Sequence, residues 1–168
     1  SVEIMIRGSR AVIDHLVEIG VPFNRTPEGD LQYTKEGAHS AARICFYKDI
    51  TGQAITETLQ NYVKGLSNVT ILEHTTMKDI LVEKDVCTGI LAETKDGDTL
   101  IVHAADTVLA TGGIGGLYEH TTNYPSLTGD ALTIAKKHGI RLEHMDYVQF
   151  HPTSLYRSTP GRSFLITE

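Results

Sequence analysis

The sequence predicts a mixed fold of helices and strands, of the α/β or α+β class, and three observations support this prediction. Apolar residues recur at helical spacing in three separate segments. Between the second and third segments lie short β-branched or apolar runs, which are typical of strands. The last of these runs leads into a glycine-rich turn and then into the third helical segment. This order of elements is typical of domains that combine helices with a sheet.

The three helices are expected within residues 2–20, 54–66 and 129–139. In the first, helical spacing is clearest in the second half, and Gly20 supplies a C-terminal stop signal. The third carries Asp130 near its start, where a carboxylate can accept hydrogen bonds from the exposed N–H groups of a helix.

Strands are expected in six runs: 69–72, 77–83, 89–94, 99–103, 106–110 and 140–143. The second, third and fourth runs form a three-stranded meander, in which Asp96-Gly97 signals a hairpin turn. The apolar run 106–110 is of the kind found in a buried parallel strand. Residues 31–43 are polar and lack apolar periodicity, so we expect a loop with functional potential there.

Composition limits the classes of function. The chain has 168 residues, 40% hydrophobic and 21% charged, which suits one globular domain. Its net charge of −6 argues against a nucleic-acid partner, and any site for an anionic substrate must be locally cationic. The sequence lacks an apolar run of about 20 residues, so we expect no membrane span. Ser1 leads straight into a helical pattern, and we expect the chain to be an internal segment of a longer protein.

The two cysteines, Cys45 and Cys87, lie in apolar surroundings and form no Cys-x-x-Cys pair. A zinc or iron–sulfur site is therefore not expected, and we predict no bound metal. Free thiols suit a reducing compartment, which favours the cytoplasm.

The glycine-rich turn Thr111-Gly112-Gly113, which follows Ala110, is the first candidate site. Glycines let a backbone approach a ligand closely, and exposed N–H groups can hold a phosphate. The spacing is not Gly-x-Gly-x-x-Gly, however, and by itself it favours a tight turn over a ligand site. For Asp130, too, the spacing alone favours a helix cap over a carboxylate that accepts hydrogen bonds from cofactor hydroxyl groups.

The other candidates are single polar side chains in irregular segments. His151 precedes a proline that restricts it to an extended conformation, and an imidazole can bind a carboxylate. Gln149 lies two residues before it, and Thr167 lies near the end of the chain. Glu36 stands in the polar loop and would matter for a substrate that carries an ammonium group; otherwise it is a solvated surface residue.

Three stretches, taken in order, resemble the flavoprotein family of succinate dehydrogenase, fumarate reductase and L-aspartate oxidase. They are TKEGAHSAARI with DITGQAI behind it, TVLATGGIGGLYEHTTNYPSLTGDALTIA, and VQFHPTSLY followed by FLITE. The resemblance implies an α/β fold. Residues 1–147 would form part of an FAD/NAD(P)-binding-type domain with an inserted β-meander, without the N-terminal dinucleotide fingerprint. Residues 148–168 would begin the capping, or substrate, domain.

The resemblance also implies roles for individual residues. The cofactor would be FAD, held by Ala110, Thr111, Gly112, Gly113 and Asp130. His151 and Thr167 would hold the substrate carboxylates, and Gln149 would line the same pocket. Glu36 would pair with the amino group of aspartate, because relatives without an amino substrate tend to carry a neutral residue there. The catalytic set implied is Glu36, His151 and Thr167.

The activity implied is FAD-dependent oxidation of L-aspartate to iminoaspartate, the first step of NAD biosynthesis. Electrons would pass to oxygen or fumarate, and quinolinate synthase would act downstream. Two alternatives stay open: a fragment of a succinate dehydrogenase or fumarate reductase flavoprotein subunit, and a stand-alone module that binds a partner without flavin.

The chain departs from the family pattern at several points. Ala38 replaces the second glycine of the loop motif, and Phe46-Tyr47-Lys48 replaces a His-Ala-Ala stretch near the FAD. The pyrophosphate fingerprint is absent from the sequence, and the arginine that the family uses as acid or base is expected beyond residue 168. We therefore expect the isolated chain to be inactive.

Overall fold

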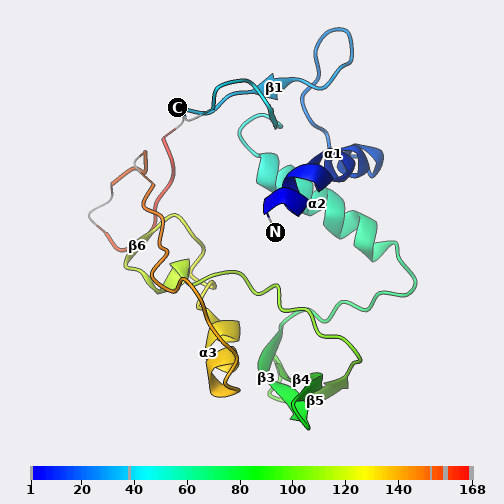
Figure 1. Cartoon of the computed structure of the whole chain (residues 1–168), viewed down its shortest axis with the longest axis vertical. Coiled ribbons are helices and arrows are strands. Elements are labelled where there is room, and N and C mark those ends of the chain that lie inside the picture. The colour runs from blue at the N-terminus through cyan, green and yellow to red at the C-terminus, as the bar shows by residue number, and fades with distance from the viewer. Residues whose placement is uncertain (1, 38, 152, 157–158, 167–168) are drawn as a thin grey trace. The chain divides into compact units, whose positions relative to one another are not determined.

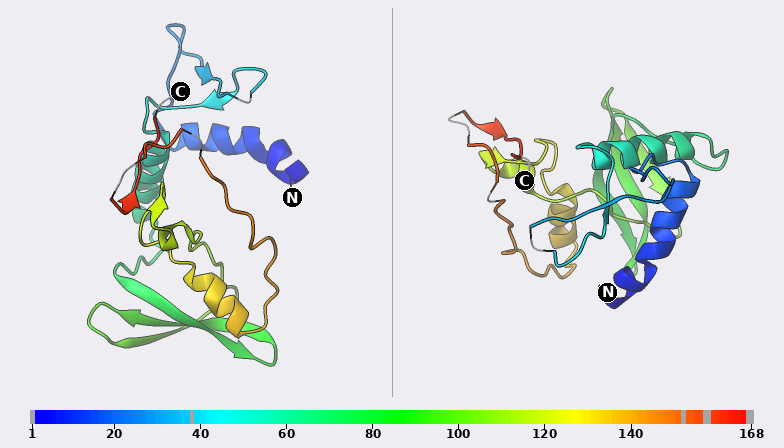
Figure 2. Two further views of the ribbon diagram at one scale, coloured as in Figure 1. Left: turned by 90° about the vertical axis from the view of Figure 1, so that its left-hand side faces the viewer. Right: turned by 90° about the horizontal axis from the view of Figure 1, so that it is seen from above.

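The computed structural model of the chain describes residues 2–37, 39–151, 153–156 and 159–166 (Figures 1 and 2). These residues fall into two compact units, Ser1–Ile71 and Leu72–Glu168. The predicted boundary between residues 147 and 148 lies inside the second unit and stays a prediction. No helix among the described residues is long and apolar enough to cross a membrane.

The first unit contains two helices and a short hairpin. Its elements in chain order are α1 (Val2–Glu18), β1 (Tyr33–Thr34), β2 (Ile44–Cys45) and α2 (Thr51–Lys64). Both predicted helices are confirmed, and Gly20, with φ +99°, follows the end of α1 as the stop signal predicted. The polar loop is also confirmed for residues 35–37 and 39–43, which connect the antiparallel strands β1 and β2.

The second unit is built on the predicted meander. Strands β3 (Thr75–Glu83), β4 (Val86–Thr94) and β5 (Thr99–His103) form one antiparallel sheet in the order β3-β4-β5 (Figure 2). Gly89 in β4 has φ +145°, and a Cβ there would lie 1.9 Å from the carbonyl oxygen of Val102. Only glycine allows β4 and β5 to approach this closely, so the sheet depends on that position.

Three of the predicted strands are wrong. Residues 69–72, 106–110 and 140–143 are extended or irregular, and they pair with no strand among the described residues. The run 106–110 is also not buried, and Val108 is 87% exposed. A β-branched or apolar run becomes a strand only where a neighbouring backbone offers hydrogen-bond partners, and local sequence does not contain that information.

The remainder of the second unit contains one short helix. Its elements are the 3₁₀ turn η1 (Gly115–Leu117), β6 (His120–Thr121), α3 (Asp130–Lys137) and β7 (Gly161–Arg162), with β6 and β7 parallel. Helix α3 confirms the third predicted helix, lies against β3, and buries Ala131, Ile134 and Ala135.

An ionic cluster joins α3 to β3. The Asp79 carboxylate in β3 accepts hydrogen bonds from Lys137 Nζ and lies 2.7 Å from Nε2 of His138, at the C-terminal end of α3. The side chain of Asp79 is only 17% exposed. The hydrogen bond from Lys137, and next that from His138, lowers the pKa of Asp79 from 3.8 to about 2.

This depressed pKa predicts an acid-dependent contribution to stability. A carboxyl group whose folded pKa lies below its unfolded value stabilises the fold above the unfolded value, and the effect is lost as the pH falls through the folded value. Asp79→Asn should therefore lower the urea midpoint of unfolding near neutral pH. The difference in urea midpoint between Asp79→Asn and the unaltered protein should shrink as the pH is lowered from 3.8 to about 2. Asp96→Asn, in an exposed turn, is the control. Equal midpoints for Asp79→Asn and the unaltered protein at neutral pH would contradict the prediction.

Candidate functional site

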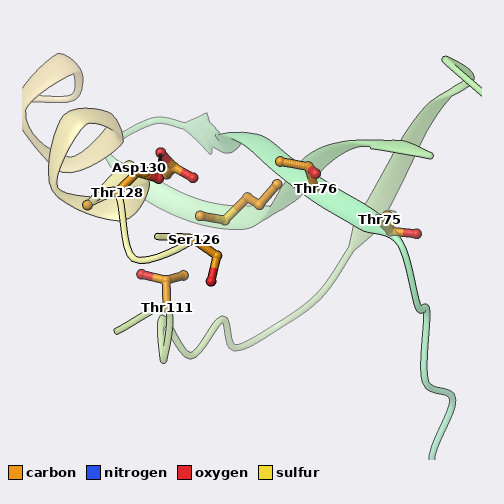
Figure 3. A pocket seen from close by; sticks show the side chains of 8 residues that line it. Thr75, Thr76, Thr111, Ser126, Thr128 and Asp130 are labelled. Carbon is orange, nitrogen blue, oxygen red and sulfur yellow. Dashed lines mark hydrogen bonds between the residues drawn. The ribbon is translucent and has the colours of Figure 1, made fainter. Parts of the chain in front are cut away.

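A small polar cavity lies between β3 and the start of α3. It has a volume of about 220 Å³. Figure 3 shows Thr75 and Thr76 of β3 on one side, and Thr111, Ser126 and Asp130 toward the other. Its lining residues are Thr75, Thr76, Met77, Thr111, Ser126, Thr128, Gly129 and Asp130. Hydroxyl groups and one carboxylate suit a ligand that carries hydroxyl groups of its own.

Asp130 does not cap α3, so the interpretation that spacing alone favoured is wrong. Gly129 occupies the N-cap position with φ +72°, and the cap forms no side-chain hydrogen bond. A Cβ at Gly129 would lie 2.4 Å from Cγ2 of Ile114, so a larger capping residue would not fit there. The Asp130 carboxylate instead accepts a hydrogen bond of 2.9 Å from the Thr128 hydroxyl and lines the polar cavity.

The glycines of the turn at 112–116 have different roles. Gly112 has φ +75°, a conformation that favours glycine, and a Cβ there would lie 2.7 Å from the side chain of Leu127. At Gly116 a Cβ would lie 2.7 Å from the carbonyl oxygens of Tyr124 and Pro125. These two positions are therefore restricted by the packing of the chain against itself. Gly113, by contrast, has open space where a Cβ would stand. A ligand could approach the backbone at Gly113.

A larger cavity of about 620 Å³ brings together three of the predicted site residues, Gly113, Gln149 and His151. Its lining also includes His120 and His144, and aromatic side chains such as Tyr118, Tyr147, Phe150 and Tyr156. None of the lining residues found in the described part of the chain is an aspartate or a glutamate. The lining thus offers three imidazoles that can donate hydrogen bonds to an anion, and of these His120 also lies 4.0 Å from the carboxylate of Glu119.

The hydrogen bonds of His151 indicate which ring nitrogen can donate. The backbone N–H of Thr153 donates to Nδ1 of His151 at 3.4 Å, and the Thr153 hydroxyl lies 2.9 Å from the same nitrogen. Because Nδ1 accepts from an N–H group, a neutral imidazole carries its proton on Nε2. His151 can thus offer an Nε2–H donor to a carboxylate in either protonation state.

Among the described residues, the predicted site residues Glu36, Ala110 and Gly112 line neither cavity. Glu36 is exposed in the loop between β1 and β2, within the first unit. Ala110 is exposed and adjoins Thr111, which lines the polar cavity. Thr167 lies outside the described residues. The sequence analysis missed His120 and His144, whose only signal was their position shortly after the glycine turn and shortly before His151.

Arg162 is a further cation near the larger cavity that the sequence analysis missed. Its guanidinium lies 4.0 Å from the ring centroid of Tyr124, and its Nε donates to the carbonyl oxygen of Thr122. Thr122 lines the cavity, and so does Ser163, the neighbour of Arg162 in sequence. These two contacts hold the guanidinium in place beside the cavity.

Sequence comparison relates the whole chain to flavoproteins. The profile of the FAD binding domain family matches residues 1–168. The L-aspartate oxidase of Clostridium acetobutylicum is 41% identical over 169 aligned positions, and that of Clostridium perfringens is 38% identical over 169. These alignments cover all of this chain but only 39% and 38% of the two proteins. The chain therefore spans about two fifths of the length of these curated relatives.

Solved structures show the same relationship in three dimensions. A variant of E. coli quinol fumarate reductase superimposes with a TM-score of 0.91 at 30% identity, over 97% of this chain and 27% of that one. A quinol-fumarate reductase with bound menaquinol gives a TM-score of 0.86 at 32% identity, over 93% of this chain and 26% of that one. These likenesses place the chain's fold among FAD-binding domains.

The contrast between Gly113 and Gly116 gives a test of the turn. Gly116→Ala should lower the free energy of unfolding by about 1–3 kcal/mol, because its Cβ meets backbone atoms that cannot move aside freely. Gly113→Ala should change it by less than about 0.5 kcal/mol, since its Cβ enters open space. Thermal unfolding followed by circular dichroism measures both variants. Equal destabilisation by the two changes would show that the turn packs differently.

Proposed function

The chain belongs to the FAD binding domain family, so FAD is its cofactor, and we propose that it is part of an enzyme that oxidises L-aspartate to iminoaspartate. The observation that carries the proposal is the 41% and 38% identity to L-aspartate oxidases across the whole chain. Glu36, for which the family resemblance implies pairing with an amino group, supports the aspartate branch.

The residues around the polar cavity fit part of an FAD molecule. Asp130 and the hydroxyls of Thr111 and Thr128 can hydrogen-bond to hydroxyl groups of the cofactor. A carboxylate would repel the phosphates, so we assign this cavity to the uncharged polyol or ribose groups. The open space at Gly113 allows close approach of the cofactor to the backbone.

The larger cavity fits the dicarboxylate. In the proposal, Nε2–H of His151 donates to one substrate carboxylate, Gln149 lines the pocket, and Thr167 holds the other carboxylate. Glu36 accepts hydrogen bonds from the substrate's ammonium group and so selects aspartate. FAD, when bound, supplies the acceptor for the two electrons that leave the substrate. Holding the reacting carbon in place can lower the activation barrier by up to ~7–11 kcal/mol. In this proposal, the residues named above hold the substrate in that position.

We also propose an electron acceptor for the reaction and an enzyme that uses its product. Oxygen or fumarate would take up the electrons, and quinolinate synthase would use the iminoaspartate in the first steps of NAD biosynthesis. Cys45 and Cys87 are unpaired thiols, which suits the cytoplasm as the site of the reaction.

Fumarate reduction is the second candidate function, and the TM-score of 0.91 to a fumarate reductase favours it. The two activities differ in one chemical respect, since fumarate carries no ammonium group. A residue that serves only the ammonium group should therefore affect aspartate oxidation and leave fumarate reduction intact. Glu36 is that residue in this proposal.

Glu36→Gln in the full-length enzyme tests the assignment. Removing a charged hydrogen-bond partner of the ammonium group should lower kcat/KM for aspartate about 10- to 100-fold, which corresponds to roughly 1.5–3 kcal/mol. Fumarate reduction by the same variant should change by less than about threefold. Glu28→Gln, another exposed carboxylate of the first unit, is the matched control. Unchanged aspartate turnover in Glu36→Gln would refute the amino-group role and favour the fumarate reductase alternative.

A further inference from the structure

Asp79 is a shielded charged group that the proposed reaction does not use. Its side chain is 17% exposed, against 64% for its partner Lys137 and 23% for His138. One carboxylate oxygen accepts from Lys137 Nζ, and the other lies 2.7 Å from His138 Nε2 and accepts the backbone N–H of Ile80 at 3.0 Å. All three partners lie on β3 or at the C-terminal end of α3, so the cluster fixes these two elements to each other.

The polar cavity lies where the same two elements begin, while Asp79 stands in the middle of β3 and Lys137 is the last residue of α3. Thr75 and Met77 of β3 and Asp130 of α3 line the cavity, whereas Asp79 and Lys137 meet further along each element. Four residues of strand from Thr75 to Asp79 span about 13 Å. Seven residues of helix from Asp130 to Lys137 span about 10 Å. The two elements therefore run side by side in the same direction, with the cavity where both begin and the ionic cluster further along.

The side chains that α3 buries are apolar, unlike the ionic contacts of Asp79. The buried residues of α3 are Ala131, Ile134 and Ala135, and two of them are alanines. The hydrophobic effect that favours their burial is not directional, whereas hydrogen bonds to a carboxylate are. At the start of the helix, the backbone N–H of Gly116 donates to the carbonyl oxygen of Leu127 at 2.9 Å, which holds only the preceding loop. At the C-terminal end of α3, the directional contacts are those that Lys137 and His138 make with Asp79.

We propose that Asp79 is a positioning residue for the cofactor: by anchoring the end of α3 to β3, it sets the width of the polar cavity and so the affinity for FAD. Asp79 itself lines neither cavity among the described residues, so it acts through Met77 on β3 and Asp130 on α3. The inference rests on the proposed function to the extent that the polar cavity receives part of FAD.

Titration of the full-length apoprotein with FAD, followed by quenching of flavin fluorescence, tests this role. The temperature is kept well below the unfolding midpoint of each apoprotein. Asp79→Asn should raise the Kd for FAD about fivefold or more, a size typical of residues that act at a distance through packed elements. Asp79→Glu keeps the charge on a longer side chain, so its Kd for FAD should lie between those of the unaltered protein and Asp79→Asn. Asp96→Asn removes the same charge from an exposed turn and should leave the Kd unchanged.

Each result supports or overturns the inference. If the Kd of Asp79→Asn for FAD stays within about twofold of the Kd of the unaltered protein, Asp79 has a structural role only and the inference is overturned. This holds whatever happens to the melting temperature of the variant. If Asp79→Asn does not fold, Lys137→Met is tested in its place, because Lys137 is mostly exposed and His138 still contacts Asp79. Lys137→Met should raise the Kd for FAD about threefold, and an unchanged Kd would overturn the inference. An unaltered protein that takes up no FAD would refute the proposed function itself, which separates the two failures.

Discussion

Close packing of the glycine turn against the loop before α3 is the constraint on which both cavities depend. At Gly112, Gly116 and Gly129 a side chain would lie within 2.7 Å of Leu127, of the carbonyl oxygens of Tyr124 and Pro125, or of Ile114. At Gly116 the atoms met belong to the backbone and cannot move aside freely, while Gly112 and Gly129 also have positive φ values of +75° and +72°, which favour glycine. The turn is thereby held so that Thr111 faces one cavity and Gly113 the other.

The two cavities differ in chemistry in the way that two different ligands require. The smaller combines hydroxyl groups with the carboxylate of Asp130, and it suits neutral hydroxyl groups. The larger has His120, His144 and His151 and, within the described residues, no acidic side chain. The chain has a net charge of −6, so its surface as a whole would repel a dicarboxylate. A cavity whose described lining has no acidic side chain is therefore a place where a dicarboxylate could bind.

The sequence predicted those parts of the structure that depend on local signals. The meander followed from short apolar or β-branched runs and from the Asp96-Gly97 turn, and the three helices from apolar spacing. The strand expected at 106–110 failed because Val108 and its neighbours have no hydrogen-bonded partner among the described residues. A strand depends on what lies beside it, and that information is not in the run itself.

The candidate site shows the same division. Gly113, Gln149 and His151 were predicted from their motifs and do line one cavity. Asp130 was placed correctly at the start of α3, but its carboxylate turned out to line a cavity, since Gly129 takes the cap position. Asp79 gave no signal at all, because its partners lie 58 and 59 residues away in sequence. Contacts of that separation emerge only once the fold is known.

The central claim is that His151 binds a dicarboxylate next to a flavin that is held by other residues. This role can be tested by adding a non-reacting dicarboxylate such as malonate to the full-length, FAD-loaded protein and recording the flavin difference spectrum. We expect a saturable spectral change whose affinity for malonate weakens at least about tenfold in His151→Ala while the FAD content stays the same. An identical change in His151→Ala, or no change in the unaltered protein, would contradict it.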